Sequence, residues 1–75
     1  MAVLDVKGLK CPLPVLRAKK ALAALEPGAT IDVEATDPAA LKDFPAFCGM
    51  TGHVLVETRT EGDVFRFTIR RGNDR

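Results

Sequence analysis

The chain of 75 residues has no tryptophan, no tyrosine and only four phenylalanines. Proteins that bind single strands of nucleic acid stack the bases on aromatic side chains, and such platforms are scarce here. Eleven Lys and Arg against ten Asp and Glu give a net charge of +1, which provides little of the basic field of a nucleic-acid binder. We therefore expect no direct nucleic-acid partner.

Cysteine and histidine are also rare, with two cysteines and one histidine. Two cysteines are too few for a disulfide scaffold, and no Cys/His cluster has the spacing of a metal site. No apolar run is long enough to span a membrane, and no segment resembles a secretory leader. We expect one globular domain over residues 1–75, monomeric and cytoplasmic, without metal, cofactor or membrane partner.

Cys11 lies in the most informative segment, Gly8-Leu9-Lys10-Cys11-Pro12-Leu13-Pro14. Proline is tolerated in the first helical turn, so the two prolines predict a helix start with Cys11 at or near its N-cap. There the helix dipole and the neighbouring lysine would lower the pKa of the thiol and make it reactive. The alternative is a buried thiol acting as a small hydrophobe. The candidate reactive residue is Cys11, supported by Gly8, Pro12, Leu13 and Pro14.

Four basic residues near this thiol are candidates for binding a partner protein: Lys10, Arg17, Lys19 and Lys20. They either dock an acidic partner or only solubilise a helix face, and the sequence leaves both open. Cys48 lies in an apolar stretch and is interpreted as a packing thiol, the alternative being a resolving cysteine for Cys11. His53 is interpreted as a capping or packing residue rather than a general base.

Hydrophobic periodicity predicts strands over residues 2–6, 30–36, 54–60 and 64–70. Helices are predicted over 12–25 and 38–44, with Pro45 kinking the second or starting a short turn through Cys48, and with a frayed tail over 71–75. The order β-α-β-α-β-β predicts a two-layer α/β (α+β) sandwich with a mixed four-stranded sheet and both helices on one face. The other sheet face is expected to be polar and solvated.

The chain resembles the TusA/SirA family of small sulfur-carrier proteins, whose signature is Cys-Pro-x-Pro near the N-terminus. The likeness covers nearly the whole chain: Leu4-Asp5, Gly8 to Pro14, Pro27-Gly28, Asp37-Pro38-Ala39, Asp43-Phe44-Pro45, Phe47-Cys48 and Gly52-His53. Many members that act in tRNA thiolation carry glutamate where this chain has Leu13, which leaves the pathway open.

The resemblance implies a sulfurtransferase-type carrier rather than a stand-alone enzyme. A cysteine desulfurase or other donor would load Cys11 as a persulfide, and a downstream acceptor protein would take the sulfur for tRNA thiolation, sulfur oxidation or cofactor sulfuration. Two alternatives come from other classes. One is a thiol redox sensor that uses Cys11 and Cys48, and the other is an RNA-binding module, against which the near-neutral charge counts.

Overall fold

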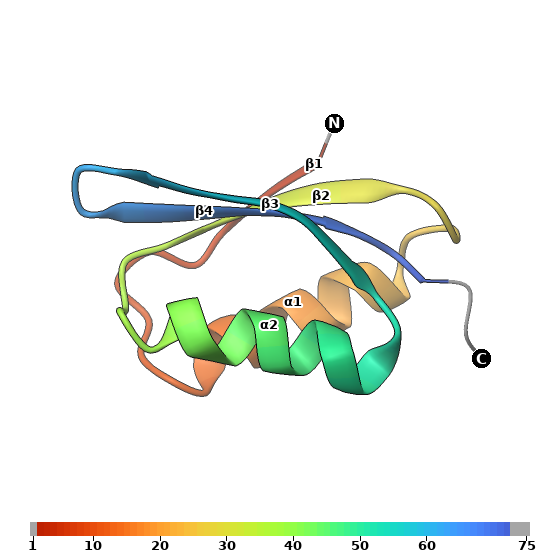
Figure 1. The fold of residues 1–75 in the computed structure, drawn as a ribbon, viewed down its shortest axis with the longest axis horizontal. Coiled ribbons are helices and arrows are strands. Elements are labelled where there is room, and N and C mark those ends of the chain that lie inside the picture. Colours follow the sequence, from red (N-terminus) through yellow and green to blue (C-terminus); the bar gives the residue numbers. More distant parts are fainter. Residues whose placement is uncertain (1, 73–75) are drawn as a thin grey trace.

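The structure, a computed structural model, describes residues 2–72. Its elements are β1 (Ala2–Asp5), α1 (Leu13–Ala23), β2 (Thr30–Ala35), α2 (Ala40–Thr51), β3 (Val54–Glu61) and β4 (Val64–Arg70). The strands form one sheet in the order β1-β2-β4-β3, with β1 and β2 parallel and the other neighbours antiparallel. Both helices lie on the same side of the sheet (Figure 1). The predicted two-layer sandwich with a mixed sheet is confirmed, and every strand bound agrees within one residue.

The hydrophobic core fills the space between the sheet and the helices. Alternate residues of β2 face the helices, and Ile31, Val33 and Ala35 are all buried. On β4 the ring of Phe67 is fully buried and stacks on Phe44 of α2, with 4.6 Å between ring centroids. One stripe of α1 faces the core, with Ala18 and Leu22 buried and Val15 half-buried, and Leu25 just after the helix packs against the same core.

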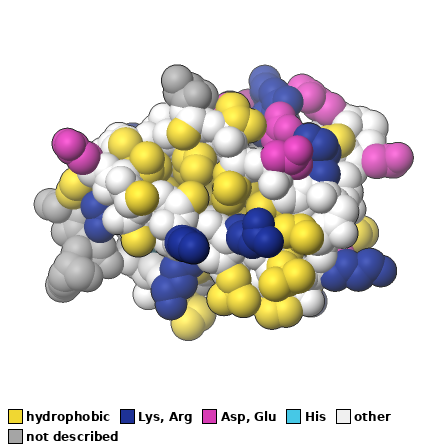
Figure 2. Space-filling view, turned by 180° about the vertical axis from the view of Figure 1, so that it is seen from behind, with side chains coloured by type: hydrophobic (Ala, Val, Ile, Leu, Met, Phe, Trp, Pro, Cys, Tyr) yellow, Lys and Arg dark blue, Asp and Glu magenta, His cyan; other side chains and the backbone are white. Residues whose placement is uncertain are grey.

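Several apolar side chains of the two helices are exposed to solvent. Leu13 and Leu16 of α1 are about half exposed, and Met50 of α2 is 86% exposed. Figure 2 shows the molecule from behind the view of Figure 1, with Lys and Arg side chains set among hydrophobic ones. This side is therefore amphipathic, with basic groups around apolar surface.

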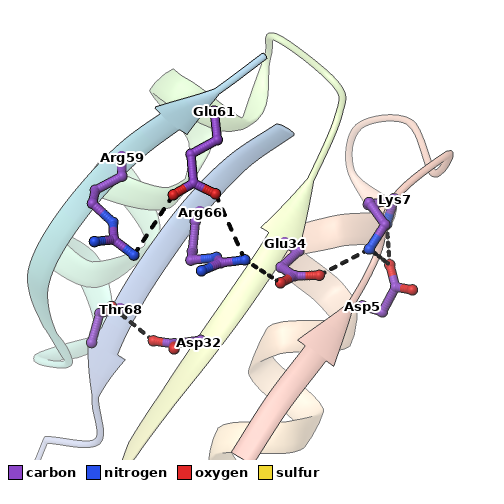
Figure 3. Close-up of polar contacts among 8 residues, drawn as sticks. All are labelled: Asp5, Lys7, Asp32, Glu34, Arg59, Glu61, Arg66 and Thr68. Carbon is purple, nitrogen blue, oxygen red and sulfur yellow. Dashed lines mark hydrogen bonds and ion pairs between the residues drawn. The ribbon is translucent and has the colours of Figure 1, made fainter. Parts of the chain in front are cut away.

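The opposite face of the sheet is polar, as predicted, and centres on Glu34 (Figure 3). One carboxylate oxygen of Glu34 accepts from Lys7 Nζ at 2.8 Å, and the other accepts from Arg66 Nη2 at 2.8 Å. Pairing with Lys7 is the main reason why the pKa of Glu34 lies below its ordinary value. Thr68 donates to Asp32 at 2.7 Å on the neighbouring pair of β2 and β4. With the pairs from Lys7 to Asp5 and from Arg66 to Glu61, charged contacts link all four strands on the solvated face.

The second helix differs from the prediction. It begins at Ala40 rather than at residue 38. It continues without a break through Pro45 and ends at Thr51. Proline removes one intrahelical hydrogen bond, but Phe44 and Phe47 on either side of it are buried against the core and hold the helix together. Gly52 ends the helix with φ of 86°, a left-handed conformation that suits glycine.

The end of the described chain also differs from the predicted frayed tail. The N–H of Arg71 donates to the carbonyl of Ala29 at 2.8 Å, and its guanidinium donates to the carbonyl of Leu25. The N–H of Gly72 donates to Nδ1 of His53 at 2.9 Å, which confirms the packing interpretation of the histidine. The rest of that tail, residues 73–75, lies outside the described residues. The first helix ends at Ala23, two residues earlier than predicted.

Phe44→Leu should lower the free energy of unfolding by about 1–3 kcal/mol, because it removes the stack with Phe67 and leaves part of the ring volume empty. Urea unfolding measures the change. The control is Met50→Leu, on the exposed face of the same helix, which should stay within about 0.5 kcal/mol of the wild type. Equal losses in both variants would contradict this account of the core.

Candidate functional site

The loop between β1 and α1 carries the candidate thiol and is tied to the end of β2. Gly8 has φ of 84°, a left-handed conformation that glycine adopts without strain. Its N–H donates to Oγ1 of Thr36 at 2.9 Å. The N–H of Leu9 donates to the carbonyl of Val6 at 3.2 Å and closes a turn. Gly8 therefore shapes the loop that delivers Cys11.

A second tie joins Cys11 itself to the segment before α2. The backbone N–H of Cys11 donates to Oδ2 of Asp37 at 2.7 Å, and Oδ1 of the same carboxylate accepts from the N–H of Ala39 at 3.1 Å. The hydrogen bond from Cys11 is the largest cause of a pKa of Asp37 below its ordinary value, and the hydrogen bond from Ala39 is the second. One carboxylate thus fixes the thiol loop to the start of α2.

The helix start lies slightly later than predicted. Leu13 is the first residue of α1, Pro14 the second, and Pro12 occupies the cap position. Cys11 therefore lies before the cap, is exposed, and is joined to Pro12 by a cis peptide bond. Exposure rules out the buried-hydrophobe interpretation for this cysteine. For Cys48 that interpretation is confirmed, because only 6% of the residue is exposed.

The predicted lowering of the Cys11 pKa is wrong. The carboxylate of Asp43, which favours the protonated thiol, is the largest cause of a Cys11 pKa above the ordinary value of 9.0. Partial desolvation, the negative charge of Asp43 and then that of Asp37 act in the same direction. The prediction counted Lys10 and the dipole of α1, but α2 contributes the carboxylate of Asp43 and the segment before it that of Asp37.

Cys11 opens onto a groove between the two helices with a volume of about 380 Å³. Its lining is mainly apolar, from Val15 and Leu16 on α1 and Phe47 and Met50 on α2, and it includes Asp43. Hydrophobic side chains are prominent on the α1 side of the molecule (Figure 2). An exposed nucleophile beside an apolar groove is suited to reaction with a group on another protein.

The four basic candidates divide into two pairs. Lys19 lines the same groove as Cys11, and Lys10 lines a smaller hollow together with Asp37. Arg17 and Lys20 are exposed on α1 and line neither of these depressions. The structure therefore places Lys19 on the groove of Cys11 and Lys10 on the neighbouring hollow, and it sets the other two along the helix.

Three residues of this site were not among the candidates read from the sequence: Thr36, Asp37 and Asp43. An aspartate before a proline is a local pattern typical of a helix start, and it does not indicate that Asp37 would be a partner of Cys11. Asp43 has no local signal, because its role arises only when α2 is placed beside the thiol loop.

Comparison with known proteins places the chain. The family model for sulfurtransferase TusA matches residues 2–71. The chain belongs to the TusA family of sulfur carrier proteins. It is 52% identical over 68 residues to the sulfur carrier protein TusA of Allochromatium vinosum, covering 91% of this chain and 90% of that protein. YrkI of Bacillus subtilis is 47% identical over 70 residues, covering 93% of each.

A solved structure agrees with this family assignment. The crystal structure of the SirA-like protein from Desulfitobacterium hafniense matches with a TM-score of 0.83 and 32% identity, covering 97% of this chain and all of that one. Within residues 2–72 of this TusA-family chain, no helix has the length and hydrophobicity to cross a membrane. In the same range, no three His, Cys, Asp or Glu side chains converge as a metal site requires.

Asp37→Asn should destabilise the protein at neutral pH, because asparagine cannot accept both backbone hydrogen bonds with an ionised oxygen. A folded pKa below 3.8 means that the carboxylate stabilises the fold above that pH and loses this contribution as the pH falls through the folded pKa. The gap in the free energy of unfolding between wild type and variant should therefore be widest at pH 7 and shrink below pH 3.8.

Urea unfolding between pH 7 and strong acid measures this gap. Asp63→Asn, in the exposed turn between β3 and β4, is the matched control and should stay within about 0.5 kcal/mol of the wild type at pH 7. A gap for Asp37→Asn that is independent of pH would contradict the role given to its ionised carboxylate.

Proposed function

We propose that the protein carries sulfur as a persulfide on Cys11 and relays it from a donor protein, such as a cysteine desulfurase, to a thiol of an acceptor protein. The observation that supports this most is the exposed Cys11 at the edge of an apolar groove. Membership of the TusA family supports the same role.

The loading step needs only thiol chemistry. The Cys11 thiol gives its proton to water, and the thiolate attacks the terminal sulfur of the donor's persulfide. A new S–S bond forms at Cys11 as the donor's S–S bond breaks, and the donor cysteine leaves with the electron pair and takes up a proton. In unloading, the acceptor's thiolate attacks the terminal sulfur and Cys11 leaves. No net oxidation occurs and no cofactor is required, so the chain acts as a carrier rather than a stand-alone enzyme.

The motif residues have separate tasks in this proposal. Gly8 lets the loop turn, and Pro14 is buried as the second residue of α1. Leu13 adds exposed apolar surface beside the thiol. An uncharged residue at position 13 favours no single use among tRNA thiolation, sulfur oxidation and cofactor sulfuration. Lys10 and Lys19 flank the thiol, and Arg17 and Lys20 extend the basic surface along α1.

Incubation with a cysteine desulfurase and cysteine should add one sulfur atom to the wild type, because Cys11 is exposed to a donor. Intact-protein mass spectrometry measures the gain, and dithiothreitol should remove it. Cys11→Ser should gain nothing, whereas Cys48→Ala should gain the same sulfur, since Cys48 is buried. A wild type that gains no sulfur from several donors would overturn the proposal, and loss of the gain in Cys48→Ala would favour a two-cysteine mechanism.

The basic residues of α1 should govern the rate at which partners associate. Arg17→Glu with Lys20→Glu should slow sulfur transfer on the order of tenfold at low ionic strength, because surface charges act mainly on association. Transfer kinetics at several salt concentrations measure this. The control is Arg59→Glu with Arg70→Glu, two charge reversals on β3 and β4 rather than on the helices. Equal rates in both double variants would indicate that the basic residues of α1 solubilise the helix and do not bind partners.

A further inference from the structure

Asp43 lines the same groove as the proposed sulfur-carrying residue, Cys11. It lies in the first turn of α2. The hydrogen bond of 2.7 Å from the Cys11 N–H to Asp37 holds the thiol loop against the start of this helix. Thr36 makes a second tie between the same two segments. These contacts therefore hold the backbone of Cys11 beside the start of α2, where Asp43 lies.

The other charged groups around Cys11 differ from Asp43 in what they bind. Both oxygens of Asp37 accept backbone hydrogen bonds, which engage that carboxylate. Lys10 lies beside Asp37, and Lys19 lines the groove from α1. Among the described residues the half-buried carboxylate of Asp43 makes no ion pair, and no N–H donates to it. Its charge is therefore free to act on the thiol.

We propose that Asp43 lowers the thiolate fraction of Cys11 in the free carrier, and that a Lys or Arg of a docked partner raises this fraction by pairing with Asp43. This inference rests on the proposed function and deepens it, since it names the group through which docking activates the carrier. The raised pKa of Cys11, with Asp43 as its largest cause, agrees with the geometry. On pairing, the proton of the thiol passes to water and the thiolate attacks the donor's persulfide.

Such an arrangement suits a carrier that moves between partners. The thiolate, not the thiol, reacts with oxidants and electrophiles, so a protonated Cys11 is protected while the protein is free. Neutralising a carboxylate inside the contact then restores reactivity only where a partner is present. The partner this predicts presents a cation close to its own reactive thiol.

The test uses the full chain with Cys48→Ala, so that Cys11 is the only thiol, and measures the alkylation rate with iodoacetamide against pH. Adding Asp43→Asn should lower the pH midpoint of the reaction. Since thiolate nucleophilicity falls with pKa with a slope of about 0.4–0.5, each tenfold gain in thiolate should raise the rate at pH 7 about threefold. Above both midpoints the variant should be slower than the parent, so the two profiles should cross.

Two control variants separate charge from structure. Asp43→Glu keeps the charge and should restore the parent midpoint, and Asp63→Asn removes a charge in the β3–β4 turn and should change nothing. Added potassium chloride screens Asp43, so it should speed alkylation of the parent at pH 7 more than that of Asp43→Asn.

Profiles of parent and Asp43→Asn that coincide would overturn the inference. Faster alkylation of Asp43→Asn at every pH would also overturn it, because that result indicates a loosened loop rather than a lost charge. These measurements need no sulfur donor, so their failure is distinct from a failure to load persulfide, which would instead overturn the proposed function.

Discussion

The parallel pairing of β1 with β2 is the constraint on which the site depends. Ala2 to Asp5 align with Ile31 to Glu34, and each strand is followed by a helix on the same face of the sheet. Because both strands run in one direction, both helices begin at the same end of the sheet. The loop before α1, which carries Cys11, therefore meets the segment before α2, which carries Asp37. The backbone N–H of Cys11 and the carboxylate of Asp37, 26 residues apart in sequence, come into hydrogen-bond contact because the two strands run in the same direction.

The elements and the layer order could be predicted because local patterns are strong in this chain. The alternation of Ile31, Val33 and Ala35 and the stripe through Ala18 and Leu22 each indicate one buried face. The position of Cys11 before a helix follows from the prolines, within one or two residues. Pro45 gave a misleading local signal, because core burial of Phe44 and Phe47 outweighs one missing hydrogen bond. Arg71 was assigned to a frayed tail because its partners, Ala29 and Leu25, are distant in sequence.

The electrostatics of the thiol could not be predicted from the motif, for a related reason. Sequence neighbours of Cys11 are a lysine and a helix N-terminus, and both favour the thiolate. Asp43 lies 32 positions further along the chain and reaches the sulfur only through the packing of α2 against α1. Net charge gives no indication either, since acidic and basic residues are nearly balanced over the whole chain. A pKa is set by the few groups nearest in space, and these belong here to the second helix and the segment before it.

A raised thiol pKa slows both halves of a relay at neutral pH. A thiolate of higher pKa is the stronger nucleophile, but the smaller fraction of thiolate outweighs this gain and slows loading at Cys11. The same thiolate is the poorer leaving group, which slows unloading. On the proposed function, a persulfide on Cys11 is therefore retained while Asp43 keeps its charge unpaired. Neutralisation of Asp43 by an acceptor would lower the pKa of the leaving sulfur and hasten its departure. The same carboxylate would then restrict both the uptake and the release of sulfur to contacts with partner proteins.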